Sequence, residues 1–194
     1  NASFLASLQF LEPALGLFGV LRLGKFRDKG IPVDNISNFN SGKEQIVYMA
    51  SQKDLNLYRL LFTTAQANMK VVDGGEFDVN KRTVAATKLI EGDTLLSVRS
   101  VADVKQVVLQ SQNGYFLKFD VEQIPEKKKT AVGVRGMKLG VGDTLREVYY
   151  LTVAEDAQEK EEASAANITY NDKPLDLRAL KSALRDGKGS KPKL

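Results

Sequence analysis

Short apolar runs rich in β-branched and aromatic residues recur along this chain, and each is bounded by glycine, proline or asparagine. The clearest are residues 60–64 and 107–111, each followed by a turn and a second run at 69–72 and 115–119. Runs of this length and composition are typical of β-strands, and paired runs around a turn indicate hairpins. The pattern therefore predicts an all-β fold built from hairpins.

Asn113-Gly114 is the strongest turn signal in the chain. It predicts a two-residue hairpin, because both residues tolerate the positive φ angles that such a turn needs. The N-terminal part is expected to hold similar strands at 4–11, 20–26 and 45–50. The apolar run from residue 4 to 23 is not expected to enter a membrane, because Glu12, Pro13, Gly16 and Gly19 interrupt it and no basic run precedes it.

Turn glycines recur at a constant spacing: Gly42, Gly92 and Gly142 lie 50 residues apart. Gly-Asp-Thr-Leu occurs at 92–95 and again at 142–145. A period near 50 residues is typical of propeller-like arrays. We therefore expect one domain over residues 1–153, made of three blade-like units at about 4–50, 58–101 and 106–152.

Residues 154–194 differ from the repeats, and we expect an acidic linker followed by a basic tail. The acidic, alanine-rich stretch 155–166 indicates a helical or disordered linker. A strand is possible at 168–170, with Asn171-Asp172 as its turn. Asp176 is a candidate N-cap for a short helix that Gly187 would end.

Composition narrows the function. The chain of 194 residues carries 28 Lys and Arg against 24 Asp and Glu, for a net charge of +4, and it contains no His and no Cys. A basic folded surface favours anionic partners, with nucleic acid first. Without His, Cys or paired carboxylates, an active site within this segment is not expected. Because the sequence starts at Asn1 rather than methionine, we expect it to be a fragment of a longer protein.

Cationic residues recur at matching places in the units, and they are the candidate nucleic-acid contacts. The densest group lies in the third unit, its counterpart in the second, and a weaker echo in the first. A second set lies on the return strands of the three hairpins, 48 residues apart, where alternation predicts an outward side chain. The candidates are Lys127, Lys128, Lys129, Arg135, Lys138, Lys81, Arg82, Lys88 and Lys29, with Lys118, Lys70 and Arg22 on the return strands. Simple solvation is the alternative for each.

Three further features have competing interpretations. Asp93 and Asp143 fit a turn role better than metal ligation, because no other acid is placed beside them by spacing. Gly133 and Gly136 would allow close approach to phosphate, or would mark a bulge. The pair Tyr149-Tyr150 fits strand packing better than catalysis, because no activating base accompanies it.

The repeats resemble the C-terminal domain of the A subunit of bacterial type IIA DNA topoisomerases, DNA gyrase and topoisomerase IV. The resemblance rests on residues 107–119, a hydrophobic strand with a Gln-Asn-Gly turn and an aromatic-Leu-Lys-Phe return. It rests also on residues 130–145, Thr-Ala-Val-Gly-Val-Arg-Gly-Met-Lys-Leu followed by Gly-Asp. The second repeat matches less well, since Ala67-Asn68 stands where the turn glycine belongs.

The resemblance implies a β-pinwheel, a propeller-like disc whose blades exchange strands and whose basic rim bends double-stranded DNA without sequence readout. It implies a bacterial, cytoplasmic, nucleoid-associated protein. Its partners would be DNA, the other domains of the parent topoisomerase and its ATPase subunit. No cofactor, metal site or catalytic residue is implied for this segment, although the parent would be an ATP-hydrolysing topoisomerase. The Gln-Arg-Arg-Gly-Gly-Lys-Gly box of gyrase is absent, which leaves the subtype open. The alternative function is a propeller-like scaffold for protein partners.

Overall fold

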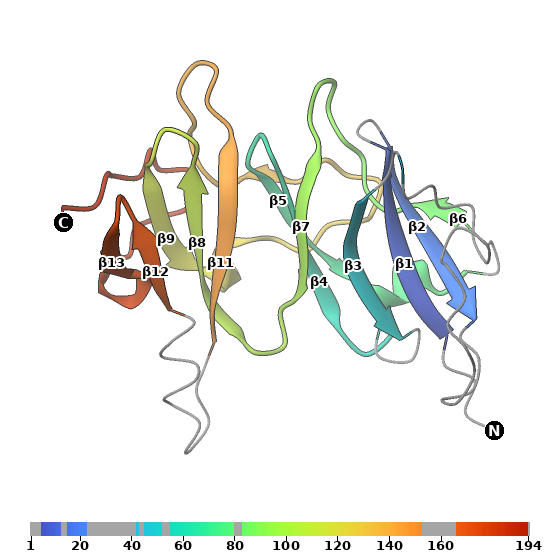
Figure 1. The fold of residues 1–194 in the computed structure, drawn as a ribbon. Helices are drawn as coiled ribbons and strands as arrows, with labels where there is room; N and C mark the ends of the chain where they lie inside the picture. The colour runs from blue at the N-terminus through green and yellow to red at the C-terminus, as the bar shows by residue number, and fades with distance from the viewer. Residues whose placement is uncertain are drawn as a thin grey trace.

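The computed structural model describes residues 5–12, 15–22, 42, 45–51, 55–79, 83–152 and 166–193. Within them the chain forms antiparallel sheets with short 3-10 helices and no helix long and apolar enough to cross a membrane. The sheets stand side by side along the molecule (Figure 1). The all-β, blade-like fold expected from the sequence is confirmed.

Within the described residues four units follow one another, each built on a hairpin. Unit 1 holds β1 (Leu5–Glu12), β2 (Leu15–Arg22) and β3 (Gln45–Ser51), and unit 2 holds β4 (Arg59–Thr64), β5 (Asn68–Asp73), β6 (Thr83–Ala85) and β7 (Leu95–Ser100). Unit 3 holds β8 (Val104–Ser111), β9 (Phe116–Asp120), β10 (Val134–Arg135) and β11 (Leu145–Thr152), and unit 4 holds β12 (Asn167–Tyr170) and β13 (Lys173–Asp176).

Units 2 and 3 each give a strand to the sheet of the unit before them. The sheets have the orders β3-β1-β2-β6, β10-β5-β4-β7 and β11-β8-β9, so β6 of unit 2 pairs with β2 and β10 of unit 3 pairs with β5. Unit 4 extends the third sheet in the same way, through bridges from Ser182 and Ser190 to β9. We call the stretch that follows each return strand and pairs with the preceding unit the donor segment. This is the strand exchange that the resemblance implies.

An Asp ends the return strand in units 2, 3 and 4, and a 3-10 helix follows it. The helices are η1 (Gly74–Phe77), η2 (Val121–Gln123) and η3 (Leu177–Ala179). Asp73 and Asp176 cap their helices, accepting from the backbone N–H of Gly75 and Arg178 at 2.8 Å. A carboxylate there satisfies a donor that the short helix leaves free. Asp120 makes no such side-chain bond to η2, so the Asp and the 3-10 helix recur in all three units but the cap is made only in units 2 and 4.

The hydrophobic cores lie between the units rather than inside them. One core joins units 2 and 3 through Leu61, Met69, Val107 and Phe119, and another joins units 3 and 4. A third contains Phe62 and Phe77 of unit 2, with side chains of β3 packed against it. Because both faces of a central sheet are covered, β4 is buried at every position after Arg59. The expected alternation between a buried and an exposed face is wrong for these strands.

The structure corrects one turn prediction and confirms another. The β8–β9 connection is a three-residue loop, Gln112-Asn113-Gly114, in which only Gly114 has a positive φ, at 78°. This combination is a type I turn followed by a left-handed residue. The two-residue turn is found instead at Asn171-Asp172, where φ is 51° and 60° and Tyr170 pairs with Lys173. That strand and its turn were expected from the sequence.

The end of the chain is packed rather than helical. Leu175 and Leu177 are buried in a core with Val108 and Phe116 of unit 3. The helix expected after Asp176 is the three-residue η3, because the chain then becomes extended and lies along β9. The linker expected at 155–166 falls almost entirely outside the described residues.

Candidate nucleic-acid interface

Two loops of equivalent sequence rise beyond the sheets at the top of Figure 1, and we call them finger loops. They comprise residues 88–94, before β7, and 138–144, before β11. Each closes a turn through one backbone bond, from Asp93 N to Ile90 O and from Asp143 N to Gly140 O, both 3.1 Å. Their equivalence confirms the repeat seen in the sequence.

The two Asp residues act in turns, as expected. Asp93 is buried and its carboxylate accepts from the backbone of Gln66 at 2.9 Å and the side chain of Asn68 at 3.2 Å. Asp143 accepts from the backbone of Asn113 at 3.2 Å. Each carboxylate therefore ties a finger loop to the hairpin turn of its own unit, and fixes where the lysine at the base of the loop stands.

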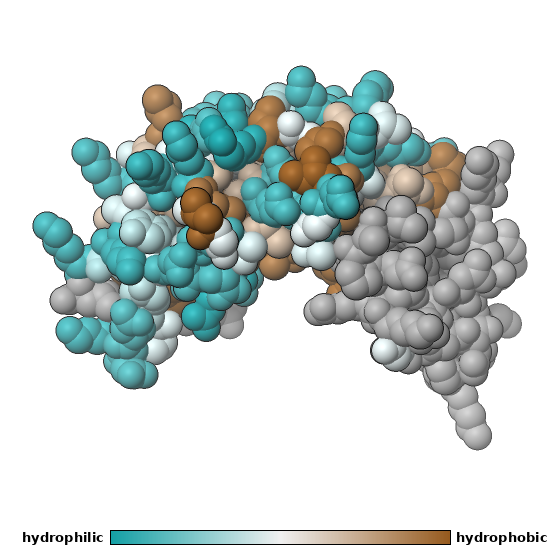
Figure 2. Space-filling view, turned by 90° about the horizontal axis from the view of Figure 1, so that it is seen from above, coloured by the Kyte–Doolittle hydropathy of each residue, from teal (hydrophilic) through white to brown (hydrophobic). Residues whose placement is uncertain are grey.

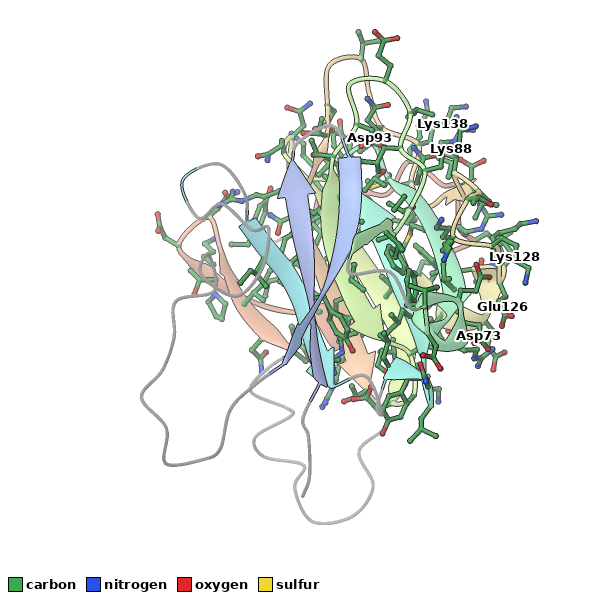
Figure 3. The ribbon with its side chains drawn as sticks, turned by 90° about the vertical axis from the view of Figure 1, so that its right-hand side faces the viewer. Asp73, Lys88, Asp93, Glu126, Lys128 and Lys138 are labelled. Carbon is green, nitrogen blue, oxygen red and sulfur yellow. The ribbon has the colours of Figure 1, made fainter. Side chains whose placement is uncertain are left out.

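Lys88 and Lys138 occupy these equivalent bases, and both are exposed. In Figure 3 they project, with Lys128, to the same side of the molecule, while Asp93 is turned inward. Within the described residues, neither Lys88 nor Lys138 has a carboxylate within 4 Å (the ion pairs found involve other residues). The sequence prediction that matching cations line one side is thus consistent with the geometry at these positions.

The cluster at residues 127–129 does not act as three equal cations. Lys127 and Lys128 are exposed, and the ammonium of Lys128 lies 3.5 Å from Glu76 Oε1. Lys129 is turned inward: its Nζ donates to the carbonyl of Glu76 at 2.6 Å and lies 5.7 Å from the ring centroid of Phe77. Lys127 and Lys128 therefore remain as surface cations, whereas Lys129 joins unit 3 to η1 of unit 2.

Arg135 is committed to an ion pair. Its guanidinium donates through two nitrogens to both oxygens of Asp186 in unit 4. This contact raises the pKa of Arg135 and lowers the pKa of Asp186. The bidentate geometry binds the donor segment of unit 4 to β10, so this cation is partly neutralised.

Lys70 on β5 is buried, with 1% of its surface exposed, so the predicted outward orientation is wrong. Its Nζ donates to three backbone carbonyls of unit 3, those of Lys128 at 3.3 Å, Lys129 at 2.7 Å and Ala131 at 2.6 Å. Burial lowers the pKa of Lys70 to about 8, an effect that Glu76 partly opposes.

Lys118, at the equivalent place on β9, is buried in the same way, and its predicted outward orientation is also wrong. Its Nζ donates to the carbonyl of Arg178 in unit 4 at 2.6 Å. Burial lowers the pKa of Lys118 against the opposing effects of Asp176 and Asp120. Both return-strand lysines therefore contact the next unit.

Four candidates fall wholly or partly outside the described residues. Lys29, Lys81 and Arg82 are not described. Arg22 is the last residue of β2, where it pairs with Leu5, and its side chain is not described. These residues stay predictions from the sequence.

The other features have structural explanations. Gly133 has a φ of 109°, and a Cβ added there would lie 2.5 Å from the carbonyl oxygen of Met69, so the close approach is to β5. A Cβ added at Gly136 would instead meet the side chains of Met69 and Leu109. The hydroxyl of Tyr149 donates to Gln110 at 2.7 Å and that of Tyr150 bonds to Ser97 at 2.6 Å. Burial raises the pKa of both tyrosines, which fits strand packing.

A basic cleft beside the second finger loop was missed from the sequence. It has a volume of about 450 Å³ and lies between the β8–β9 turn and residues 137–143, with Lys138 and Lys188 among its lining residues. The ammonium of Lys191 lies 5.2 Å from the ring of Tyr115 at its edge. The signal was available in Gly187-Lys188-Gly189, but the expectation of a separate basic tail kept these residues apart from the repeats.

The finger-loop end of the molecule is mostly hydrophilic. Figure 2, which looks down on it, shows a curved band of hydrophilic side chains with separate hydrophobic groups between them. The exposed apolar side chains include Ile90 and Val141 on the finger loops. The surface can therefore meet an extended anionic partner along a curve, with cations from successive units.

Comparison with known proteins agrees with this geometry. Residues 58–102 and 105–149 match the family model described as DNA gyrase C-terminal domain, beta-propeller. The chain is 35% identical over 103 residues to the DNA gyrase A protein of Helicobacter pylori, which covers 52% of this chain and 12% of that protein. It is 29% identical over 168 residues to the corresponding gyrase protein of Staphylococcus epidermidis, covering 85% of this chain and 18% of that one. The chain thus spans under a fifth of the length of these two relatives.

Solved structures share the fold. The crystal structure of the C-terminal domain of DNA topoisomerase IV superposes with a TM-score of 0.74 at 20% identity, covering 96% of this chain and 58% of that one. A DNA gyrase A C-terminal domain gives 0.66 at 20% identity, covering 97% and 60%. Strand exchange, repeat spacing and sequence agree, and the two repeats at residues 58–102 and 105–149 match the DNA gyrase C-terminal β-propeller domain family.

Proposed function

We propose that this chain binds and bends duplex DNA as the C-terminal module of the A protein of a bacterial, cytoplasmic type IIA topoisomerase. The observation that carries the proposal is the placement of Lys88 and Lys138. They are exposed, lie at equivalent sites of consecutive units and project to one side, with no carboxylate within 4 Å in the described chain.

Phosphate is the chemical group that this arrangement suits. Lysine is a flexible point charge that contacts phosphate without reading bases, so the interaction would be independent of sequence. Lys127, Lys128 and Lys188 would add contacts from neighbouring loops. Because the hydrophilic band is curved, a duplex that meets cations from several units has to bend. Catalysis and ATP hydrolysis would belong to the other domains and the ATPase subunit, which would be its protein partners.

The test is duplex binding as a function of salt. The double variant Lys88→Ala/Lys138→Ala is compared with wild type by fluorescence anisotropy on two unrelated duplexes. Each lost phosphate contact lowers the slope of log affinity against log salt by about 0.9, so the double variant should lose about two units on both duplexes. Energy transfer between the duplex ends should rise on binding if the DNA bends.

Lys105→Ala is the matched control, because Lys105 is an exposed lysine at the start of β8, at the opposite end of that strand from the finger loop. It should leave the slope unchanged. A double variant indistinguishable from this control would remove the finger lysines from the interface. Wild-type protein without salt-dependent duplex binding would overturn the proposal and favour a scaffold for protein partners.

A further inference from the structure

The loop at residues 127–131 curls around a buried charge. Three of its backbone carbonyls, from Lys128, Lys129 and Ala131, point inward and converge on Nζ of Lys70, at 2.6 to 3.3 Å. A buried carbonyl needs a donor, and an ammonium has three N–H groups to offer. Lys70 therefore supplies a donor to the carbonyls of Lys129 and Ala131, and a second donor to the carbonyl of Lys128, which also accepts from Ala131 N at 2.9 Å.

Unit 2, which carries Lys70, also binds the loop 127–131 at a second place. Glu76 on η1 accepts from the backbone N–H of Lys129 at 3.0 Å. Unit 2 thus holds the loop of unit 3 at two places. The ammonium of Lys70 donates to the loop carbonyls, and the carboxylate of Glu76 accepts from the backbone N–H of Lys129. With the backbone turned inward, the side chains of Lys127 and Lys128 are left facing solvent, and Lys128 is 83% exposed.

The contact recurs one unit later. Lys118 reaches the carbonyl of Arg178 at 2.6 Å, and Ala183 N donates to the carbonyl of Lys118 at 2.8 Å. Between units 2 and 3 the corresponding backbone bond runs from Lys127 N to the carbonyl of Val71, also at 2.8 Å. A buried lysine on the return strand therefore accompanies the docking of the next donor segment at both places.

We infer that Lys70 is a positioning residue, which holds the loop 127–131 of the following unit in the conformation that presents Lys127 and Lys128 outward. Lys118 holds the following unit in a similar way, through the carbonyl of Arg178 in η3. Any effect on DNA rests on the proposed function, whereas the effect on the loop does not.

Limited trypsin digestion of the folded protein tests the inference, because trypsin cuts after lysine. Lys70→Met keeps most of the length of the side chain but removes all three donors, together with the cation–π contact to Phe62, whose ring centroid lies 5.7 Å from Nζ. Each lost hydrogen bond weakens the loop's hold, so cleavage after Lys127–Lys129 should accelerate at least about tenfold. Cleavage after Lys88 in the same molecules should not change.

Lys118→Met is the reciprocal control. It should accelerate cleavage after Arg178 and Lys181 and leave the loop 127–131 as resistant as in wild type. Circular dichroism at the digestion temperature establishes that both variants are folded. Equal cleavage of the 127–129 sites in wild type and Lys70→Met would overturn the inference, and so would acceleration of those sites by Lys118→Met.

Measurements of duplex affinity then distinguish a role of Lys70 in positioning Lys127 and Lys128 from a role in stability alone. Lys70→Met should weaken binding in the wild-type background but have no further effect when Lys127 and Lys128 are already alanine. Additive losses would show that Lys70 acts elsewhere and would overturn the positioning role. If wild type does not bind duplex at all, the proposed function fails, and digestion alone still decides whether Lys70 holds the loop.

Discussion

At the scale of single residues, lysines with the same charge have opposite roles. Lys88 and Lys138 stand in water at the bases of the finger loops, whereas Lys70 and Lys118 lie inside and bind carbonyls. Burying an ammonium costs free energy even when it is hydrogen-bonded, because the charge leaves water. For Lys70 that cost appears as its lowered pKa.

The lowered pKa makes stability depend on pH. Below pH 8, Lys70 is charged in both the folded and unfolded states. Between pH 8 and its ordinary pKa of 10.5, the folded state releases the proton and the unfolded state keeps it, so the free energy of unfolding rises with pH. From pH 7.5 to 10 we expect wild type to gain about 2 kcal/mol relative to Lys70→Met, measured by urea denaturation. If the difference in unfolding free energy between wild type and Lys70→Met does not change with pH, the ammonium is not desolvated.

The sequence predicted the recurrence of Lys70 and Lys118 but not their orientation. Alternation assigns a direction only when one face of a strand meets solvent. Here neighbouring units cover both faces of the sheet, so no set of alternate positions faces solvent. The finger lysines are exposed because they lie in loops, where a cation has no core to enter, and their contact with nucleic acid stays a prediction.

At the scale of elements, the donor segments join the separate hairpins into one array. Strand β10 has two residues, Val134 and Arg135, paired with Met69 and Asn68. So short a strand has no hydrophobic period of its own, and nothing in the sequence alone showed which unit it joins. The hairpins β4–β5 and β8–β9 are longer and were placed correctly from their apolar runs.

Gly133 tests how closely the donor segment must approach. Gly133→Ala puts a Cβ 2.5 Å from a backbone oxygen in a left-handed conformation, so we expect a loss of about 2 to 4 kcal/mol in unfolding free energy. Gly140→Ala, in a finger loop with nothing within 4 Å of the added Cβ, should stay within about 0.5 kcal/mol of wild type. Both are measured by urea denaturation, and similar values for the two would contradict tight docking of β10.

At the scale of the whole molecule, stability comes from the seams between units. Val108 and Phe116 of unit 3 are buried only with the help of unit 4, whose Leu175 and Leu177 share their core. The ion pair of Arg135 with Asp186 crosses the same seam. The sequence indicated repeats, but a repeat signal does not say that the last stretch is needed to cover the unit before it.

Removing residues 166–193 should therefore damage unit 3. It would expose Val108, Phe116 and Leu151, at about 1.5 to 3 kcal/mol each, for a total loss of about 5 kcal/mol. Urea denaturation gives the loss, and increased binding of an apolar dye reports the uncovered core. Removing only residues 191–194 keeps the bridge between Ser190 and Phe116 and should change little. Equal stability of both truncations would mean that unit 4 is dispensable.

Strand donation has a consequence for how such a protein changes over evolutionary time. Each unit completes the sheet before it, so the stretch from one turn to the next is not a self-contained block. A duplication that copied one unit would insert a new hairpin together with a donor segment that pairs with the unit before it, and the copy would fit without a gap only if that segment matched the sheet edge it meets. The effect of a mutation therefore depends on whether it falls in a hairpin or in a donor segment. A lesion in a donor segment harms the unit upstream of it, while the hairpin that follows still finds its own partner.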